Sequence, residues 1–117
     1  MDELIGKQIV KITGLEEGSD EVYITTHDGT FMFYHDQNCC ENVRIVDLEL
    51  GSDNFEGAFI LSAKEVSSNN EPAPTENSES YTWTFYKIET TKGEIWMRWL
   101  GESNGWYSEE VSFKRIK

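Results

Sequence analysis

The chain has 117 residues, of which 22 are acidic and 10 are basic, so its formal net charge is −12. Its length favours one domain spanning residues 1–117. The acidic balance argues against nucleic acid as the main partner, because a phosphate backbone needs a basic face. No apolar run approaches the ~18 residues of a membrane span, and Met1–Gly6 lacks the basic and apolar regions of a signal peptide. We therefore expect a cytoplasmic protein.

Alternating apolar and β-branched residues predict strands along most of the chain. In chain order these are Lys7–Thr13, Glu21–Thr26, Thr30–Tyr34, Val43–Leu48, a stretch around Ala58–Leu61, Tyr81–Phe85, Ile95–Leu100 and Trp106–Phe113. Asp28-Gly29, Lys92-Gly93 and Asn104-Gly105 are turn signals, so the last three strands are expected to form a meander. The sequence predicts a mainly β fold, an antiparallel sandwich or strongly curved sheet with one or two short helical turns.

Residues 67–80 form the one low-complexity segment and hold both prolines. They carry no large apolar side chain that could anchor them to a core. We interpret them as a mobile surface loop between two strands, and not as a domain boundary.

Negative charge is concentrated in residues 16–56, which hold eleven acidic residues and one basic residue, Arg44. This segment is either a solvated surface that keeps the chain soluble or a face that docks on a basic surface of another macromolecule. The spacing of the carboxylates between Asp47 and Glu56 does not fit a calcium-binding loop. The candidate partner-binding residues are Glu16, Glu17, Asp20, Glu21, Asp47, Glu49 and Asp53.

The run from Tyr34 to Glu41 is the candidate metal site. His35 and Cys39 are four residues apart, so one helical turn would place both on one face, and Cys40 could reach the same point. Two thiolates and an imidazole suit Zn²⁺ in tetrahedral coordination, in a structural site. The fourth ligand could be Asp36 or Glu41 nearby, or Asp47 or His27 farther away. The alternative is two buried free thiols and a polar histidine at a strand end.

The two cysteines are adjacent, so a bond between them would be strained. Neighbouring Cα atoms lie ~3.8 Å apart, whereas a relaxed disulfide spans ~4.4–6.8 Å. With no third cysteine, we expect no disulfide framework, in agreement with a reducing compartment.

Catalysis has weak support in the sequence. A cysteine beside His35 could form a nucleophile–base pair, but the zinc-deaminase, phosphate-loop, H-E-x-x-H and nucleophile-elbow motifs are absent. We therefore expect that this chain is not an enzyme.

The aromatic back half offers a further alternative to the acidic face. Trp83, Trp96, Trp99, Trp106 and Tyr107 could stack single-stranded nucleic acid, but core packing explains them better because few basic residues lie near them. A subset left exposed could form a partner-binding or dimer surface.

Several runs resemble a family of small acidic phage and prophage proteins of uncharacterised function. They are Met1–Gly6, Tyr34-His35-x-Gln37-x-Cys39-Cys40-Glu41, Tyr81-x-Trp83-Thr84-Phe85-Tyr86-Lys87 and Arg98-Trp99-x-Gly101-Glu102-Ser103-Asn104-Gly105. Proteins of this kind include anti-CRISPR proteins, and the chain is similar in size and character to a zinc-containing type II-A anti-CRISPR protein from a streptococcal prophage.

This resemblance implies that the chain inhibits the type II CRISPR effector nuclease by direct protein binding, inside a host bacterial cell. It also favours zinc at His35, Cys39 and Cys40. The alternatives are a phage accessory or structural protein with a structural zinc site, whose aromatic meander makes an oligomer interface, and a small thiol or zinc enzyme.

Overall fold

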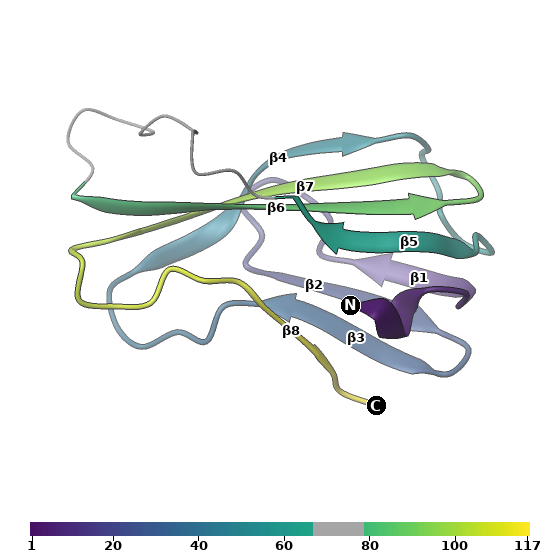
Figure 1. The fold of residues 1–117 in the computed structure, drawn as a ribbon, viewed down its shortest axis with the longest axis horizontal. Helices are drawn as coiled ribbons and strands as arrows, with labels where there is room; N and C mark the ends of the chain where they lie inside the picture. Colours follow the sequence, from purple (N-terminus) through teal and green to yellow (C-terminus); the bar gives the residue numbers. More distant parts are fainter. Residues whose placement is uncertain (67–78) are drawn as a thin grey trace.

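A computed structural model describes residues 1–66 and 79–117. The described chain contains one 3-10 turn, η1, and eight strands (Figure 1). Their bounds are η1 Asp2–Leu4, β1 Ile9–Thr13, β2 Glu21–Thr26, β3 Gly29–Tyr34, β4 Asn42–Leu50, β5 Ile60–Glu65, β6 Ser80–Thr90, β7 Gly93–Ser103 and β8 Ser112–Arg115. The expectation for 67–80 falls almost wholly outside the described residues.

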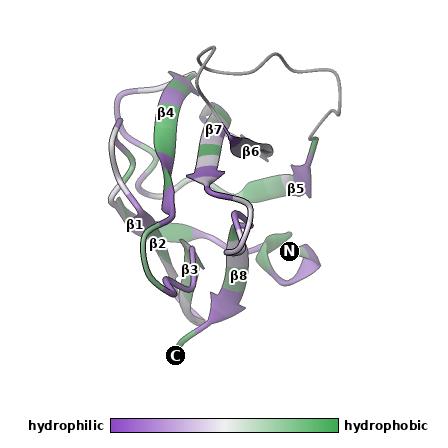
Figure 2. Ribbon diagram, turned by 90° about the vertical axis from the view of Figure 1, so that its left-hand side faces the viewer, coloured by the Kyte–Doolittle hydropathy of each residue, from purple (hydrophilic) through white to green (hydrophobic). Residues whose placement is uncertain are grey.

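The strands form two four-stranded antiparallel sheets, which lie one above the other in Figure 1 and are seen end-on in Figure 2. One sheet has the order β1-β2-β3-β8 and the other β4-β7-β6-β5. The predicted mainly β, antiparallel fold is confirmed. Within the described ranges, no helix has the length and apolar character needed to cross a membrane.

The hairpin of β6 and β7 is the longest paired element, running from Ser80 opposite Ser103 to Thr90 opposite Gly93. The Thr90 hydroxyl donates to the Gly93 carbonyl over 2.7 Å and accepts from the Lys92 backbone N–H over 3.1 Å. Gly93 has a φ of 133°, which a side chain would disfavour. The predicted Lys92-Gly93 turn is therefore confirmed.

Side chains from both sheets meet in one core. Trp99 is fully buried and is the largest of them. Phe33 of β3 packs on Tyr86 of β6, with ring centroids 4.9 Å apart, so an aromatic pair joins the two sheets. The expectation that aromatic residues build the core holds for Trp99 but not for Trp106, which is 85% exposed.

The predicted three-strand meander is wrong at its last strand. β8 does not return beside β7; it crosses to the other sheet and pairs with β3. The Phe113 ring on β8 lies 5.8 Å from that of Phe31 and 5.0 Å from that of Phe33. Partial burial of this ring against two core aromatics favours the crossover over a tight hairpin at Asn104-Gly105.

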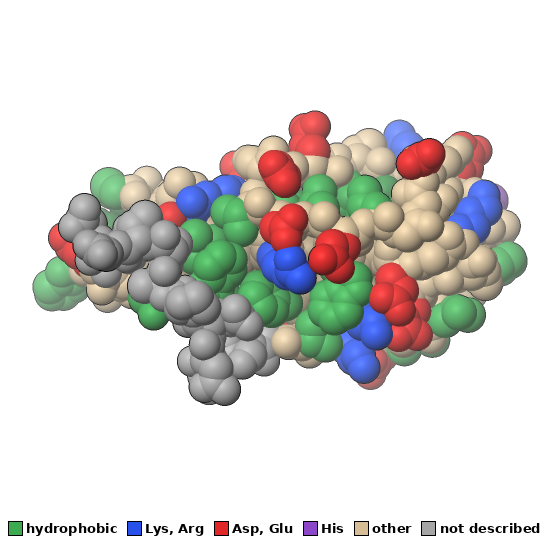
Figure 3. Space-filling model, turned by 90° about the horizontal axis from the view of Figure 1, so that it is seen from above, with side chains coloured by type: hydrophobic (Ala, Val, Ile, Leu, Met, Phe, Trp, Pro, Cys, Tyr) green, Lys and Arg blue, Asp and Glu red, His purple; other side chains and the backbone are tan. Residues whose placement is uncertain are grey.

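The outer face of the β4-β7-β6-β5 sheet mixes aromatic and charged side chains (Figure 3). Trp96 and Phe85 are half-buried there. The Lys87 ammonium lies 5.3 Å from the Trp96 ring centroid, and the Arg98 guanidinium lies 5.9 Å from that of Phe85. These cations cover aromatic surface that would otherwise face water.

Candidate functional site

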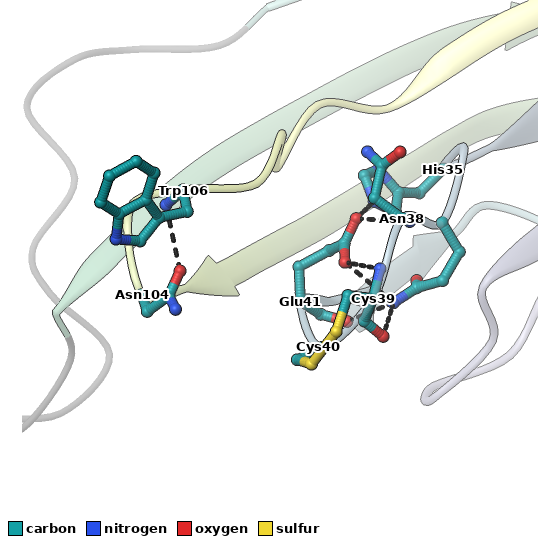
Figure 4. The surroundings of a disulfide bond; sticks show 8 residues. His35, Asn38, Cys39, Cys40, Glu41, Asn104 and Trp106 are labelled. Atoms are coloured by element: carbon teal, nitrogen blue, oxygen red, sulfur yellow. Dashed lines mark hydrogen bonds and ion pairs between the residues drawn. A yellow bond between two sulfur atoms is a disulfide. The ribbon is translucent and has the colours of Figure 1, made fainter.

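The connection from β3 to β4 contains the predicted metal ligands, but it is not helical. Residues 35–41 run as an irregular loop. The predicted helical turn, which would place His35 and Cys39 on one face, is therefore wrong. The loop is organised instead around the carboxylate of Glu41, as Figure 4 shows.

Glu41 is buried and receives several hydrogen bonds. The backbone N–H groups of Asn38 and Cys39 donate to its two carboxylate oxygens over 2.9 and 2.8 Å. The Gln37 side-chain amide donates to the same carboxylate over 3.2 Å and to the Glu41 backbone carbonyl over 2.7 Å. One carboxylate thus closes the loop on itself.

His35 completes this arrangement from the end of β3. Its Nε2 atom lies 2.8 Å from Glu41 Oε2, and its Nδ1 atom lies 2.7 Å from the Glu110 carbonyl oxygen. The two side chains are almost wholly removed from water, at 2% and 0% exposed. Both ring nitrogens face acceptors, which an imidazolium satisfies by donating from each.

The protonation of Glu41 is set by opposing effects. Burial alone would raise its pKa, but the hydrogen bond from His35 and those from the backbone N–H groups of Cys39 and Asn38 outweigh burial and lower the pKa to about 2. Glu41 is therefore ionised at neutral pH. The pair ties the β3–β4 connection to the segment that precedes β8.

Cys39 and Cys40 are bonded to each other. The expectation that the two cysteines form no disulfide is therefore wrong for this structure. The alternative of two buried free thiols is wrong as well, because both residues are exposed and their sulfur atoms are joined. While that bond exists, neither sulfur is a thiolate that could bind zinc.

The predicted zinc ligands do not form a metal site in this arrangement. His35 uses both ring nitrogens on oxygen acceptors, Asp36 is exposed, and the more distant candidate Asp47 is paired with Arg98. In the described part of the chain, His, Cys, Asp and Glu side chains nowhere gather in groups of three or more that could hold a metal. Zinc remains a prediction that requires the reduced thiols.

Glu109 is a buried carboxylate that sequence reasoning did not single out. It accepts hydrogen bonds from the hydroxyls of Thr82 and Ser103, the first over 2.8 Å. It lies on the connection between β7 and β8, which passes over Gly101 so closely that a side chain there would collide with the Glu109 backbone. Two hydroxyl residues on β6 and β7 are too weak a signal to reveal this contact from sequence.

Trp106 lies on the same connection and points away from the Glu41 network (Figure 4). The Asn104 side chain accepts from the Trp106 backbone N–H over 3.0 Å, and the Ser103 hydroxyl accepts from the Gly105 N–H over 2.9 Å. These bonds hold the turn while the indole itself stays in solvent.

The predicted partner-binding carboxylates gather beside β4. The turn between β1 and β2, which carries Glu16, Glu17 and Asp20, docks on β4 through two backbone hydrogen bonds. Ile45 accepts from the Gly18 N–H over 2.7 Å and donates to the Ser19 carbonyl over 2.8 Å. The predicted partner-binding carboxylates, although far apart in sequence, thus lie along one edge of the molecule, the acidic edge.

These carboxylates are not all equally free to bind a partner. Arg98 pairs with Asp47 and lies 3.6 Å from Glu49, and Glu21 accepts a hydrogen bond from the Tyr23 hydroxyl. Glu16 and Asp53 come from separate connections and line the same cleft.

A family model for a domain of unknown function, DUF7448, matches residues 2–113. The chain belongs to the DUF7448 family. The expected membership of an uncharacterised family is therefore confirmed. Comparisons with curated proteins and with solved structures gave no match. In this member of the family, two antiparallel sheets carry a buried His35–Glu41 pair and an acidic edge along β4.

Proposed function

We propose that this chain is a non-enzymatic anti-CRISPR inhibitor. It binds the type II-A CRISPR effector nuclease through its acidic edge and blocks the loading or cleavage of target DNA. The proposal takes the nature of the partner from the resemblance to small acidic phage proteins. It takes the binding face from the gathering of carboxylates beside β4.

The observation that carries the binding face is the docking of the turn that holds Glu16, Glu17 and Asp20 onto Ile45 of β4. All three of these acidic residues are exposed. RNA-guided nucleases hold their guide–target duplex in a positively charged channel. A fixed negative edge can compete with DNA for such a surface, and fields of this kind accelerate association.

The test is a target-cleavage assay with purified nuclease and guide RNA, together with gel filtration of the mixture. We expect loss of cleavage and co-elution of the two proteins. Replacing Glu16, Glu17 and Asp20 by lysine should weaken both effects. Replacing Glu3, Glu94 and Glu110, which are also exposed, makes the same change in net charge elsewhere and should weaken them much less.

A second candidate function is favoured by Trp106. An indole that is 85% exposed on a hydrogen-bonded turn is typical of a residue that is buried in an interface. A phage accessory or structural protein that assembles through the turn carrying Trp106 would explain the exposed indole. Oligomers in gel filtration that Trp106→Ala dissociates, with no effect of the chain on the nuclease, would favour this candidate.

A further inference from the structure

A cleft of about 430 Å³ opens between β1 and the connection from β4 to β5. Three segments line it: residues 10–12 on β1, residues 14–16 of the following turn, and Leu50 together with residues 52–56. In Figure 1 the connection from β4 to β5 runs down one end of the two sheets, beside β1. The cleft is thus built from both sheets.

One wall of the cleft is apolar. Phe55 is 6% exposed and closes the inner side, Ile12 and Leu15 are half-buried, and Leu50 is 44% exposed. The exposed Leu50 surface is available to an aliphatic chain that enters the cleft. This apolar wall distinguishes the cleft from a surface that carries charged side chains alone.

The rim of the cleft is acidic. Glu16, Asp53 and Glu56 line it, and Lys11 is the basic residue among the lining residues. Within the described ranges, the three carboxylates make no ion pair. The Lys92 ammonium donates to the backbone carbonyl of Glu56 and not to its carboxylate. The rim therefore carries an excess of negative charge that a cationic group would offset.

We infer that this cleft takes an arginine side chain of the partner protein. The inference rests on the proposed function, since it names the group through which a basic partner engages the acidic edge. The aliphatic stem lies along Leu15 and Leu50, and the guanidinium reaches Glu16 and Asp53. Arginine fits better than lysine because its planar, weakly hydrated group pairs with carboxylates through several donors.

The probe is a hexaarginine peptide titrated into the full chain at low salt, with hexalysine and an uncharged peptide for comparison. The cleft variant combines Glu16→Gln, Asp53→Asn and Glu56→Gln. Its matched control combines Glu3→Gln, Glu94→Gln and Glu110→Gln, which removes the same charge from other exposed positions. Circular dichroism checks that both variants keep the fold.

The cleft variant should bind hexaarginine about tenfold more weakly, as expected for the loss of a few surface ion pairs, and the control should change little. The methyl NMR signals of Leu15 and Leu50 should shift with hexaarginine and less with hexalysine. Equal weakening by the two variants, or methyl signals that do not move, would overturn the inference. The cleavage assay reads the proposed function separately, so inhibition without peptide binding would reject the cleft alone.

Discussion

Gly101→Ala tests how the connection between β7 and β8 is held. A Cβ atom at residue 101 would lie 2.7 Å from the Cβ atom of Glu109 and closer still to its carbonyl oxygen. Carbon atoms pack without strain at about 3.5 Å or more, so the connection must withdraw by roughly 0.8 Å. That shift would stretch the 2.8 Å bond from Thr82 to Glu109 to roughly 3.6 Å, which is too long for a hydrogen bond.

The loss of folding free energy in Gly101→Ala can be estimated either from the overpacking or from the lost hydrogen bond. Overpacking of this kind costs ~1–3 kcal/mol, and a lost hydrogen bond to a charged group costs ~1.5–3 kcal/mol. We expect a loss of about 2–3 kcal/mol, which lowers the Tm by roughly 8–12 °C at this chain length. Thermal unfolding followed by circular dichroism measures it.

A double-mutant cycle with Glu109→Gln separates this mechanism from a general effect of adding a methyl group. Glu109→Gln should be destabilising in the wild-type chain but clearly less so beside Gly101→Ala, because the hydrogen bond from Thr82 is already broken there. Gly6→Ala is the control, since a Cβ atom there meets nothing within 4 Å and its cost comes from the backbone φ of 85°; its effect should add to that of Glu109→Gln. Additivity in the Gly101 cycle, or an unchanged Tm for Gly101→Ala, would refute the reasoning.

Further predictions concern the site and its surroundings. The folded-state pKa of Glu41 is about 2, below its ordinary 4.5. The ionised carboxylate therefore stabilises the fold fully above pH 4.5, and this stabilisation is lost as the pH falls through 2. The difference in Tm between wild type and Glu41→Gln should be constant at neutral pH and should disappear in acid. Trp106→Ala should leave the Tm nearly unchanged, because the side chain is 85% exposed; a clear drop would mean that the indole packs on the fold. Elemental analysis and thiol titration of untagged protein should give either zinc near one per chain with no disulfide, or no zinc with both sulfurs bonded; free thiols without zinc would contradict both states.

Much of the fold could be predicted because it depends on local patterns. Alternation fixes which residues of β6 and β7 face the core, and Lys92-Gly93 supplies the turn between them. The placement of β8 could not be predicted, because Asn104-Gly105 is a good hairpin signal. What decides the crossover is the contact of Phe113 with Phe31, residues that are distant in sequence.

The candidate site was only partly predictable for the same reason. The sequence identifies His35 and Glu41 as candidate metal ligands that lie near each other in the chain. Their pairing depends on backbone N–H groups that converge on one carboxylate, and such convergence needs an irregular loop that no periodic pattern encodes. Nothing in the local sequence marks Glu109 as a buried residue, yet the structure buries it and hydrogen-bonds it to Thr82.

The rate at which the chain associates with the type II-A nuclease, measured against salt, tests the central claim most directly. Between about 50 and about 500 mM salt, screening should slow association at least tenfold, and lysine at Glu16, Glu17 and Asp20 should remove most of that dependence. The matched lysine variant of Glu3, Glu94 and Glu110 should retain it. An association rate that ignores salt, or that falls only in the matched variant, would contradict binding through the acidic edge.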